Sequence, residues 1–242
     1  MYAVKCENLT KKYRGVTALD NCSLKVEEGS LFGLLGVNGA GKTTLIKILC
    51  GLTTPTCGDA FVLDKSVKCD MSEIKKVIDV SPQETSVAGK LTVKENLEFF
   101  AGIYYKNRAE RERAVSSVIE TFSLGEVLNR RAGKLSGGWQ RRLSIAAALV
   151  SNPKVLFLDE PTLGLDVLAR RELWQVIEKI KGKTTIILTS HYLEEIEALC
   201  DRVTVLSRGR VVAEGTVEEI KRAAGESSFE EAFVKIVTGE GL

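Results

Sequence analysis

Residues 36–44, GVNGAGKTT, lie between an apolar run, SLFGLLG, and a helical-looking stretch, KTTLIKILCGL. They match the pattern G-x-x-x-x-G-K-[ST] in the context of strand, loop and helix that the pattern requires. The glycines let backbone N–H groups converge on phosphate oxygens, and the helix start adds its positive dipole end. Lys42 would supply a charge to the β- and γ-phosphates, and Thr43 a hydroxyl group to Mg²⁺. The stretch predicts a nucleoside triphosphate site, with adenine or guanine left open.

The same alternation of strand and helix recurs along the chain. KVLFLDE at 154–160 precedes LARRELWQVIEKI, and TTIILTS at 184–190 precedes YLEEIEALC. These short runs are apolar throughout and not at every second residue, which indicates a mostly parallel sheet with helices on both faces. The predicted fold class is therefore α/β, a P-loop NTPase whose ligand lies at the carboxyl ends of the strands.

Other segments add to this core, and we expect one domain over residues 1–242. About the first 25 residues alternate as an N-terminal antiparallel β subdomain, and residues 203–215 form a hairpin. A helical subdomain is expected as an insertion at about 84–152, where Thr92 and Glu95 form a capping box. A second capping box, Thr216 with Glu219, opens a C-terminal helical tail at about 216–242.

The composition excludes several classes of protein. With 34 basic and 32 acidic side chains, the net charge of +2 does not create the field of a dedicated nucleic-acid binder. The six cysteines form no CxxC pair, so neither a metal cluster nor a redox motif is expected, and a reducing, cytosolic compartment is the simplest interpretation. The N-terminus lacks a signal pattern, and no run approaches the ~18 apolar residues that span a bilayer. We expect the isolated chain to be soluble.

Candidate catalytic residues follow the second and third apolar runs. Asp159 and Glu160 end KVLFLDE, where one carboxylate can hold Mg²⁺ through its water shell and the next can polarise an attacking water. The alternative is an acidic strand end that caps the next helix. His191, the single histidine, follows TTIILTS. Considered alone, such a histidine is more often a core or helix-start residue than a catalytic one.

The stretch LSGGWQRRLSIAAAL at 135–149 distinguishes among the many kinds of nucleotide-binding protein. Together with the phosphate loop, it resembles the ABC-type ATPases, the nucleotide-binding subunits that power ABC transporters, and the resemblance covers essentially the whole chain. By itself, SGG would be a helix start with Ser136 as its cap. The resemblance implies instead that Ser136, Gly137 and Gly138 reach across a head-to-tail dimer to the γ-phosphate held by the other copy. Trp139 departs from the family pattern, which often has glutamine or methionine there.

The resemblance also implies roles for single residues. Tyr13 would stack on adenine beside Val16, which favours ATP over GTP; Gln83 would touch the Mg²⁺ and water side; and Asp166 would cross the dimer interface, besides capping a helix. His191 would hydrogen-bond the γ-phosphate and help to hold the attacking water. The expected catalytic residues are Glu160, His191 and Gln83, and the expected metal-site residues are Thr43, Gln83 and Asp159. The expected ATP-binding residues are Tyr13, Val16, Asn38, Gly39, Ala40, Gly41, Lys42, Thr43, Thr44, Ser136, Gly137, Gly138 and Asp166.

The branch of the family sets the expected partners. The segments at 161–177 and 190–203 and the short tail look most like ATPases that serve export permeases of multidrug, antibiotic, lipid or polysaccharide type. This implies ATP and Mg²⁺ as cofactors, a separately encoded permease, a second copy of the chain, and a peripheral place on the cytoplasmic side of the membrane. Docking would use exposed side chains among Leu91, Val93, Phe99, Phe100, Ile103 and Tyr104, although most of these are expected to be helix core. Two alternatives are a soluble ATPase acting on ribosomes or DNA and a regulatory ATPase scaffold.

Overall fold

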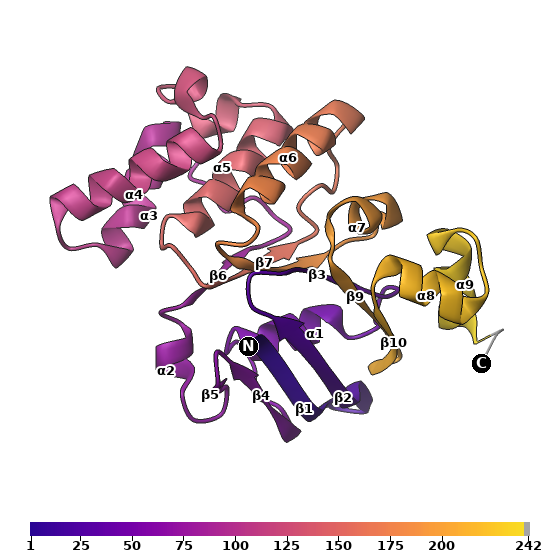
Figure 1. The fold of residues 1–242 in the computed structure, drawn as a ribbon. Coiled ribbons are helices and arrows are strands. Elements are labelled where there is room, and N and C mark those ends of the chain that lie inside the picture. The colour runs from indigo at the N-terminus through magenta and orange to yellow at the C-terminus, as the bar shows by residue number, and fades with distance from the viewer. Residues whose placement is uncertain (240–242) are drawn as a thin grey trace.

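The computed structural model describes residues 1–239, which form two sheets of different kinds (Figure 1). The smaller sheet is antiparallel, with the strand order β2-β1-β4-β5. Its strands are β1 (Tyr2–Tyr13), β2 (Val16–Glu27), β4 (Cys57–Val62) and β5 (Lys65–Ser66). The sheet expected from the N-terminal residues is thus present, and it also takes in two strands from residues 57–66.

The larger sheet has the order β10-β9-β3-β8-β7-β6. Its strands are β3 (Leu31–Leu35), β6 (Ile78–Ser81), β7 (Val155–Asp159), β8 (Thr185–Thr189), β9 (Arg202–Ser207) and β10 (Arg210–Gly215). All neighbouring pairs are parallel except the β9–β10 hairpin. The predicted mostly parallel sheet is confirmed, and so is the hairpin at its edge.

The uniform apolarity of the parallel strands has a direct cause in the packing. In β7, Val155 and Phe157 point to a core shared with the antiparallel sheet and α1 (Lys42–Leu49), whereas Leu156 and Leu158 point to a core shared with the helices on the opposite face. Successive side chains of a strand alternate between the two faces of the sheet, and here both faces are buried, so successive positions of the strand are apolar. Asp159 is the first residue of β7 that leaves this pattern, at the carboxyl end of the strand.

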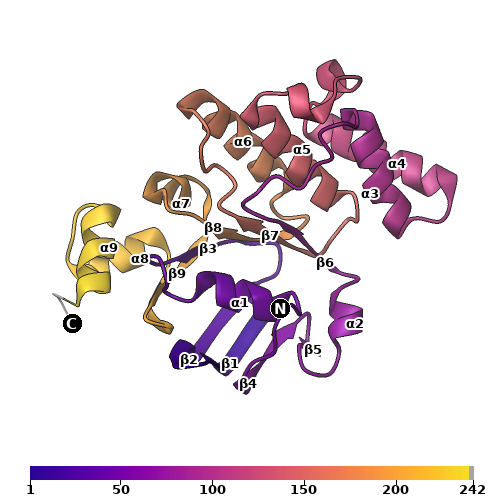
Figure 2. The same ribbon diagram turned by 180° about the vertical axis from the view of Figure 1, so that it is seen from behind.

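Helices α5, α6 and α7 cover one face of the parallel sheet, and α3 and α4 lie beside α5 (Figures 1 and 2). The remaining helices are α2 near the antiparallel sheet and α8 and α9 near the C-terminus. The bounds are α2 (Met71–Ile74), α3 (Val93–Tyr104), α4 (Arg108–Thr121), η1 (Gly125–Val127), η2 (Ala132–Lys134), α5 (Gly137–Leu149), α6 (Val167–Ile180), α7 (Leu193–Leu199), α8 (Val217–Ala224) and α9 (Phe229–Thr238). No helix within residues 1–239 is both long enough and apolar enough to cross a membrane.

Both predicted capping boxes are formed. Glu95 N donates to Thr92 Oγ1 (3.2 Å) while Thr92 N donates to Glu95 Oε2 (2.7 Å) at the start of α3. Thr216 and Glu219 make the same reciprocal pair at the start of α8. Each box satisfies two N–H groups that a helix start leaves without partners. Of the predicted C-terminal tail, residues 240–242 lie outside the described residues.

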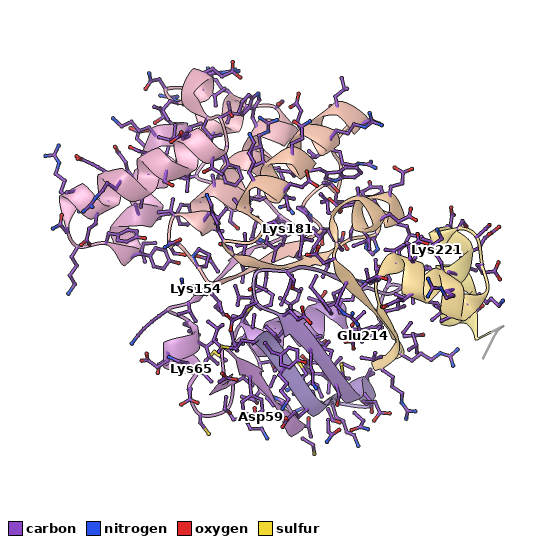
Figure 3. The ribbon with its side chains drawn as sticks, viewed as in Figure 1. Asp59, Lys65, Lys154, Lys181, Glu214 and Lys221 are labelled. Atoms are coloured by element: carbon purple, nitrogen blue, oxygen red, sulfur yellow. The ribbon has the colours of Figure 1, made fainter. Side chains whose placement is uncertain are left out.

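Charged side chains of both signs are spread over the surface of residues 1–239, and several of them form ion pairs (Figure 3). Lys181 Nζ lies 2.6 Å from Asp201 Oδ1, Lys221 Nζ lies 3.0 Å from Glu218 Oε1, and Lys65 Nζ lies 3.7 Å from Glu73 Oε2. Exposed pairs of this kind contribute little to stability. Basic and acidic side chains are nearly equal in number, which agrees with the net charge of +2.

Candidate functional site

The phosphate loop between β3 and α1 depends on glycine at two positions. Gly36 has a φ of 151°, and a Cβ there would lie 2.4 Å from the carbonyl oxygen of Leu206. Gly41 has a φ of 111°, and a Cβ there would lie 2.6 Å from the carbonyl oxygen of Ala18. Gly41 occupies the N-cap of α1 and offers no side-chain cap, which leaves N–H groups of the first turn available to an anion.

Lys42 lies inside this loop. Its Nζ donates to the carbonyl oxygens of Gly36 (2.6 Å) and Val37 (3.3 Å), and only 8% of the residue is exposed. Burial lowers the pKa of Lys42, and the nearby charges of Glu160 and Asp159 oppose that shift. The ammonium group therefore lies within the curve of the loop, where a phosphate group would meet it.

A cleft of 570 Å³ opens in front of the loop. Most of the residues expected from the sequence line it: Tyr13, Val16, Asn38, Gly39, Ala40, Gly41, Lys42, Thr43, Thr44, Gln83, Glu160 and His191. Thr17, Ala18 and Leu163 also line it and were not expected, since nothing in their local sequence distinguishes them. Tyr13 is 46% exposed, and Lys11 Nζ lies over its ring, 5.0 Å from the ring centre.

Strands β7 and β8 bring the acidic residues and the histidine together. Asp159 pairs in register with Thr189, whose Oγ1 donates to Asp159 Oδ1 (2.6 Å). Glu160 N donates to the carbonyl oxygen of Thr189 (3.1 Å), and Glu160 has a φ of 48°. A non-glycine residue in this left-handed region carries strain of order 1–3 kcal/mol. The turn brings Glu160 Oε1 to 2.5 Å from His191 Nε2, whereas Asp159 does not line the cleft.

The expected residues at 136–138 and Asp166 do not line this cleft. Asp166 caps α6, because its Oδ1 accepts from Ala169 N (2.9 Å). Ser136 occupies the N-cap position of α5, as the sequence indicated, but its hydroxyl makes no cap hydrogen bond. The first N–H groups of α5 therefore remain available, as they do in α1.

The sequence did not reveal one residue that contacts the site's backbone, Arg141. Only 4% of it is exposed, and its guanidinium donates to carbonyl oxygens that include those of Gln83 (3.1 Å) and Glu160 (2.9 Å). A signal was present: Arg141 precedes Ile145 by four residues and Ala148 by seven, which places it on the buried face of α5. A charged residue on such a face needs polar partners.

The residues expected for docking divide between core and surface. Val93 is fully buried, so it belongs to the core, and Leu91 and Phe100 are half-buried. Phe99, Ile103 and Tyr104 are 60%, 63% and 45% exposed on α3. Phe99 and Phe100 meet edge to face, with ring centroids 5.6 Å apart. The exposed apolar surface of α3 is thus limited to three side chains near its middle and its end.

The fold and the cleft define a class of nucleotide-binding protein, and comparison with known proteins gives the family. The chain belongs to the ABC transporter family, since the family model described as ABC transporter matches residues 19–163. It is an ATP-binding cassette of the kind that serves as the ATP-binding subunit of such transporters.

Named relatives and solved structures agree with this assignment. The chain is 37% identical over 241 residues to the "Probable multidrug ABC transporter ATP-binding protein YbhF" of Escherichia coli (strain K12), covering 97% of this chain and 41% of that protein. It is 39% identical over 230 residues to the "Daunorubicin resistance ATP-binding protein DrrA2" of Streptomyces coeruleorubidus, covering 95% and 71%. A structure described as a dimeric post-hydrolysis state of the ATP-binding cassette MJ0796 bound to ADP and Pi matches with a TM-score of 0.77 and 27% identity, covering 88% and 98%. The chain spans less than half the length of the first of these relatives.

Proposed function

We propose that this chain binds ATP with Mg²⁺, hydrolyses it in a site completed by a second copy of the chain, and energises export through a separate membrane permease. The observation that carries the proposal is that Lys42, Glu160 and His191 line one cleft at the carboxyl ends of the parallel strands. Phosphate binding, a carboxylate base and an imidazole are the parts that hydrolysis of a γ-phosphate requires.

ATP would enter this cleft with its base against the exposed ring of Tyr13 and its phosphates against the loop at 36–44. Val16, 63% exposed beside Tyr13 on the other arm of the β1–β2 hairpin, adds an apolar contact for the base. The N–H groups at the start of α1 and the ammonium of Lys42 hold the phosphate oxygens.

The oxygen donors near the loop fit Mg²⁺, which prefers hard oxygen ligands and keeps part of its water shell. Thr43 and Gln83, which line the cleft, carry a hydroxyl and an amide oxygen, and Asp159 at the end of β7 carries a carboxylate. When bound, Mg²⁺ would neutralise charge on the β- and γ-phosphate oxygens. Asp159, held by the Thr189 hydroxyl, is suited to contact the ion through water.

Glu160 acts in the proposal as the general base. Its carboxylate takes a proton from the attacking water, and the imidazole of His191 beside it orients that water and hydrogen-bonds the γ-phosphate. The 11% exposure of the Glu160 side chain limits its contact with bulk solvent. A partly desolvated site strengthens these electrostatic interactions.

A second copy supplies the residues that do not line the cleft. The segment at 136–138 opens α5 with free N–H groups, and Asp166 opens α6 close by on the same side of the sheet (Figure 1). In a head-to-tail dimer each copy presents these helix starts to the γ-phosphate of the other. A related cassette of known structure is described as dimeric and bound to ADP and Pi, which supports a dimer.

Export is proposed from the relatives, whose printed names refer to multidrug transport and daunorubicin resistance. The permease would be a polytopic protein that docks from the cytoplasmic side of the membrane against α3, where Phe99, Ile103 and Tyr104 are exposed. Closing and opening of the ATP-bound dimer would move this helix and the permease with it.

Two measurements test the proposal. The purified chain should release phosphate from ATP only with Mg²⁺, and the rate per chain should rise with chain concentration because two copies form each site. A tagged chain, purified in detergent from membranes of its own cells, should retain a polytopic membrane protein. Copurification of ribosomes or DNA would favour a soluble ATPase instead, and a stable dimer without turnover would favour a regulatory scaffold.

A further inference from the structure

The side chain of Arg141 makes an unusual set of hydrogen bonds for a buried charge. All five of its acceptors are backbone carbonyl oxygens, and they come from two separate segments, the loop after β6 and the last residue of β7 with the loop that follows it. Nε donates to Pro161 (2.7 Å), Nη1 to Pro82 (2.5 Å) and Gln83 (3.1 Å), and Nη2 to Asp159 (2.8 Å) and Glu160 (2.9 Å). A guanidinium has five N–H groups in a fixed planar fork, which suits it to join several acceptors at once.

The two loops carry different parts of the site. One follows β6 and contains Gln83, and the other follows β7 and contains Glu160. The backbone ladder between these strands pairs Ser81 with Leu158 at its last position, so beyond that point the strands no longer hold the loops together. Arg141 joins the two loops just past the end of the ladder.

The same residue lies on the helix that begins with the segment at 136–138. Arg141 is the fifth residue of α5, so one turn of rigid helix separates it from Gly137 and Gly138. A displacement of the start of α5 must therefore move the guanidinium, and with it the carbonyl groups of both loops. Helix α5 lies directly over β6 and β7 in both views of the fold (Figures 1 and 2).

Burial has a cost that these contacts offset. Desolvation lowers the pKa of Arg141 to about 10, while the charges of Asp159, Glu195 and Glu160 oppose the shift. A buried charge is retained only where polar groups replace its water. An apolar residue would fill the same space in α5 without this cost, but it could not hold the two loops.

We propose that Arg141 is a positioning residue that fixes the Gln83 loop and the Glu160 loop relative to each other and to the start of α5. The inference rests on the proposed ATPase function and adds to it a mechanical link between the start of α5 and the two loops of the chain's own site. The segment that faces the partner's ATP and the loops that face the chain's own ATP form one hydrogen-bonded unit. Arg141 does not line the nucleotide cleft, and it acts through the backbone of its neighbours.

The neighbouring residue offers a matched control. Arg142 Nη2 lies 2.6 Å from Glu172 Oε2, and its guanidinium carbon lies 4.8 Å from the centre of the Trp139 ring. It belongs to the same turn of the same helix, and its hydrogen bond leads to α6 and not to either loop. Arg142→Met removes a charge from α5 and leaves the loops untouched.

The experiment compares Arg141→Lys, Arg141→Met and Arg142→Met in the full chain. For each we would measure kcat, the Kd for ATP, the circular dichroism spectrum and hydrogen exchange of the segments at 82–86 and 159–163. Lysine keeps the charge but has a single ammonium group, so it cannot serve both loops. We expect Arg141→Lys to lower kcat by about tenfold to a hundredfold, because small misplacements of catalytic groups have effects of that size, while the Kd for ATP changes by less than about threefold.

Hydrogen exchange gives a readout that does not depend on turnover. Both loop segments should exchange faster in folded Arg141→Lys than in the wild type, and Arg142→Met should exchange like the wild type. Unchanged exchange in the two loops, or a kcat equal to that of Arg142→Met, would overturn the inference even if ATPase activity is normal. A wild-type chain without ATPase activity would refute the proposed function, and the exchange experiment would still decide the role of Arg141.

Discussion

His191 Nε2 lies 2.5 Å from Glu160 Oε1, although the two residues are on different strand ends. The cause is the register of two neighbouring parallel strands, in which Asp159 pairs with Thr189. Glu160 follows the first of these residues directly, and His191 follows the second by two positions. The sheet thus places a carboxylate and the chain's single imidazole in contact at one edge.

This contact predicts the behaviour of His191→Ala. The variant should bind ATP and lose most of its turnover, with kcat lower by about a hundredfold, the usual order for a group that orients water or moves a proton. Steady-state phosphate release and an ATP titration measure the two effects separately. With one histidine in the chain, no other imidazole can substitute. Unaltered turnover would return His191 to a structural role at the end of β8.

Lys42→Ala should weaken nucleotide binding itself, because the ammonium group is held in the curve of the phosphate loop by Gly36 O. We expect the Kd for ATP to rise by at least about tenfold, the effect of a charge-assisted contact worth 1.4 kcal/mol or more. Titration of a fluorescent ATP analogue measures it. Lys47→Ala, which removes an exposed lysine from the last turn of the same helix, is the control. Equal affinity in the two variants would contradict the role of Lys42.

Gly36→Ala tests the shape of the loop. Its added Cβ would lie 2.4 Å from Leu206 O and 2.8 Å from Ala40 Cβ, so the loop must shift. We expect a loss of about 1–3 kcal/mol in the free energy of unfolding, together with weaker ATP binding. Urea denaturation gives the first quantity. Gly182→Ala is the control, since Gly182 also has a positive φ (82°) but no atom within 4 Å of an added Cβ. An equal loss in both variants would show that strain at positive φ, and not the clash, sets the cost.

The half-buried carboxyl group of Asp79 should make the free energy of unfolding depend on pH. Its Oδ2 accepts from Tyr104 Oη (3.0 Å) and Ser151 Oγ (2.9 Å), and burial raises the pKa of Asp79. Because the folded state then favours the protonated acid, ionisation costs stability, and this cost sets in as the pH rises through the raised pKa. Asp79→Asn should therefore gain stability relative to the wild type between about pH 4 and pH 7. Urea denaturation at both pH values measures the difference, and a constant difference would refute the assignment.

The sequence revealed those features that have local causes. The phosphate loop needs glycines at fixed positions, and the parallel strands are apolar on both faces. Each capping box involves two residues within a stretch of four. The positions of Glu160 and His191 could be predicted as well, because both directly follow buried strands whose carboxyl ends meet at one edge.

Other features depend on contacts between distant segments and could not be predicted. Arg141 donates to carbonyl groups of residues that lie 18 to 59 positions away in the chain. Every residue has a backbone carbonyl group, so the sequence does not identify these acceptors. Glu195 is fully buried because Trp174 Nε1 and Thr162 Oγ1 donate to its carboxylate, and neither partner is its neighbour in the chain. Ser136 occupies the N-cap position that its residue type favours, but the sequence could not show that its hydroxyl makes no cap hydrogen bond.

If Glu160 is the base of an ATPase, replacing it must slow phosphate release, and Glu160→Gln measured beside the wild type shows whether it does. Glutamine keeps the shape of the side chain and loses the carboxylate that accepts a proton from water. We expect steady phosphate release by the wild type and a rate lower by about a hundredfold or more in the variant, with ATP still bound and the variant trapped as a dimer. Phosphate release by Glu160→Gln at the wild-type rate would show that Glu160 is not the base.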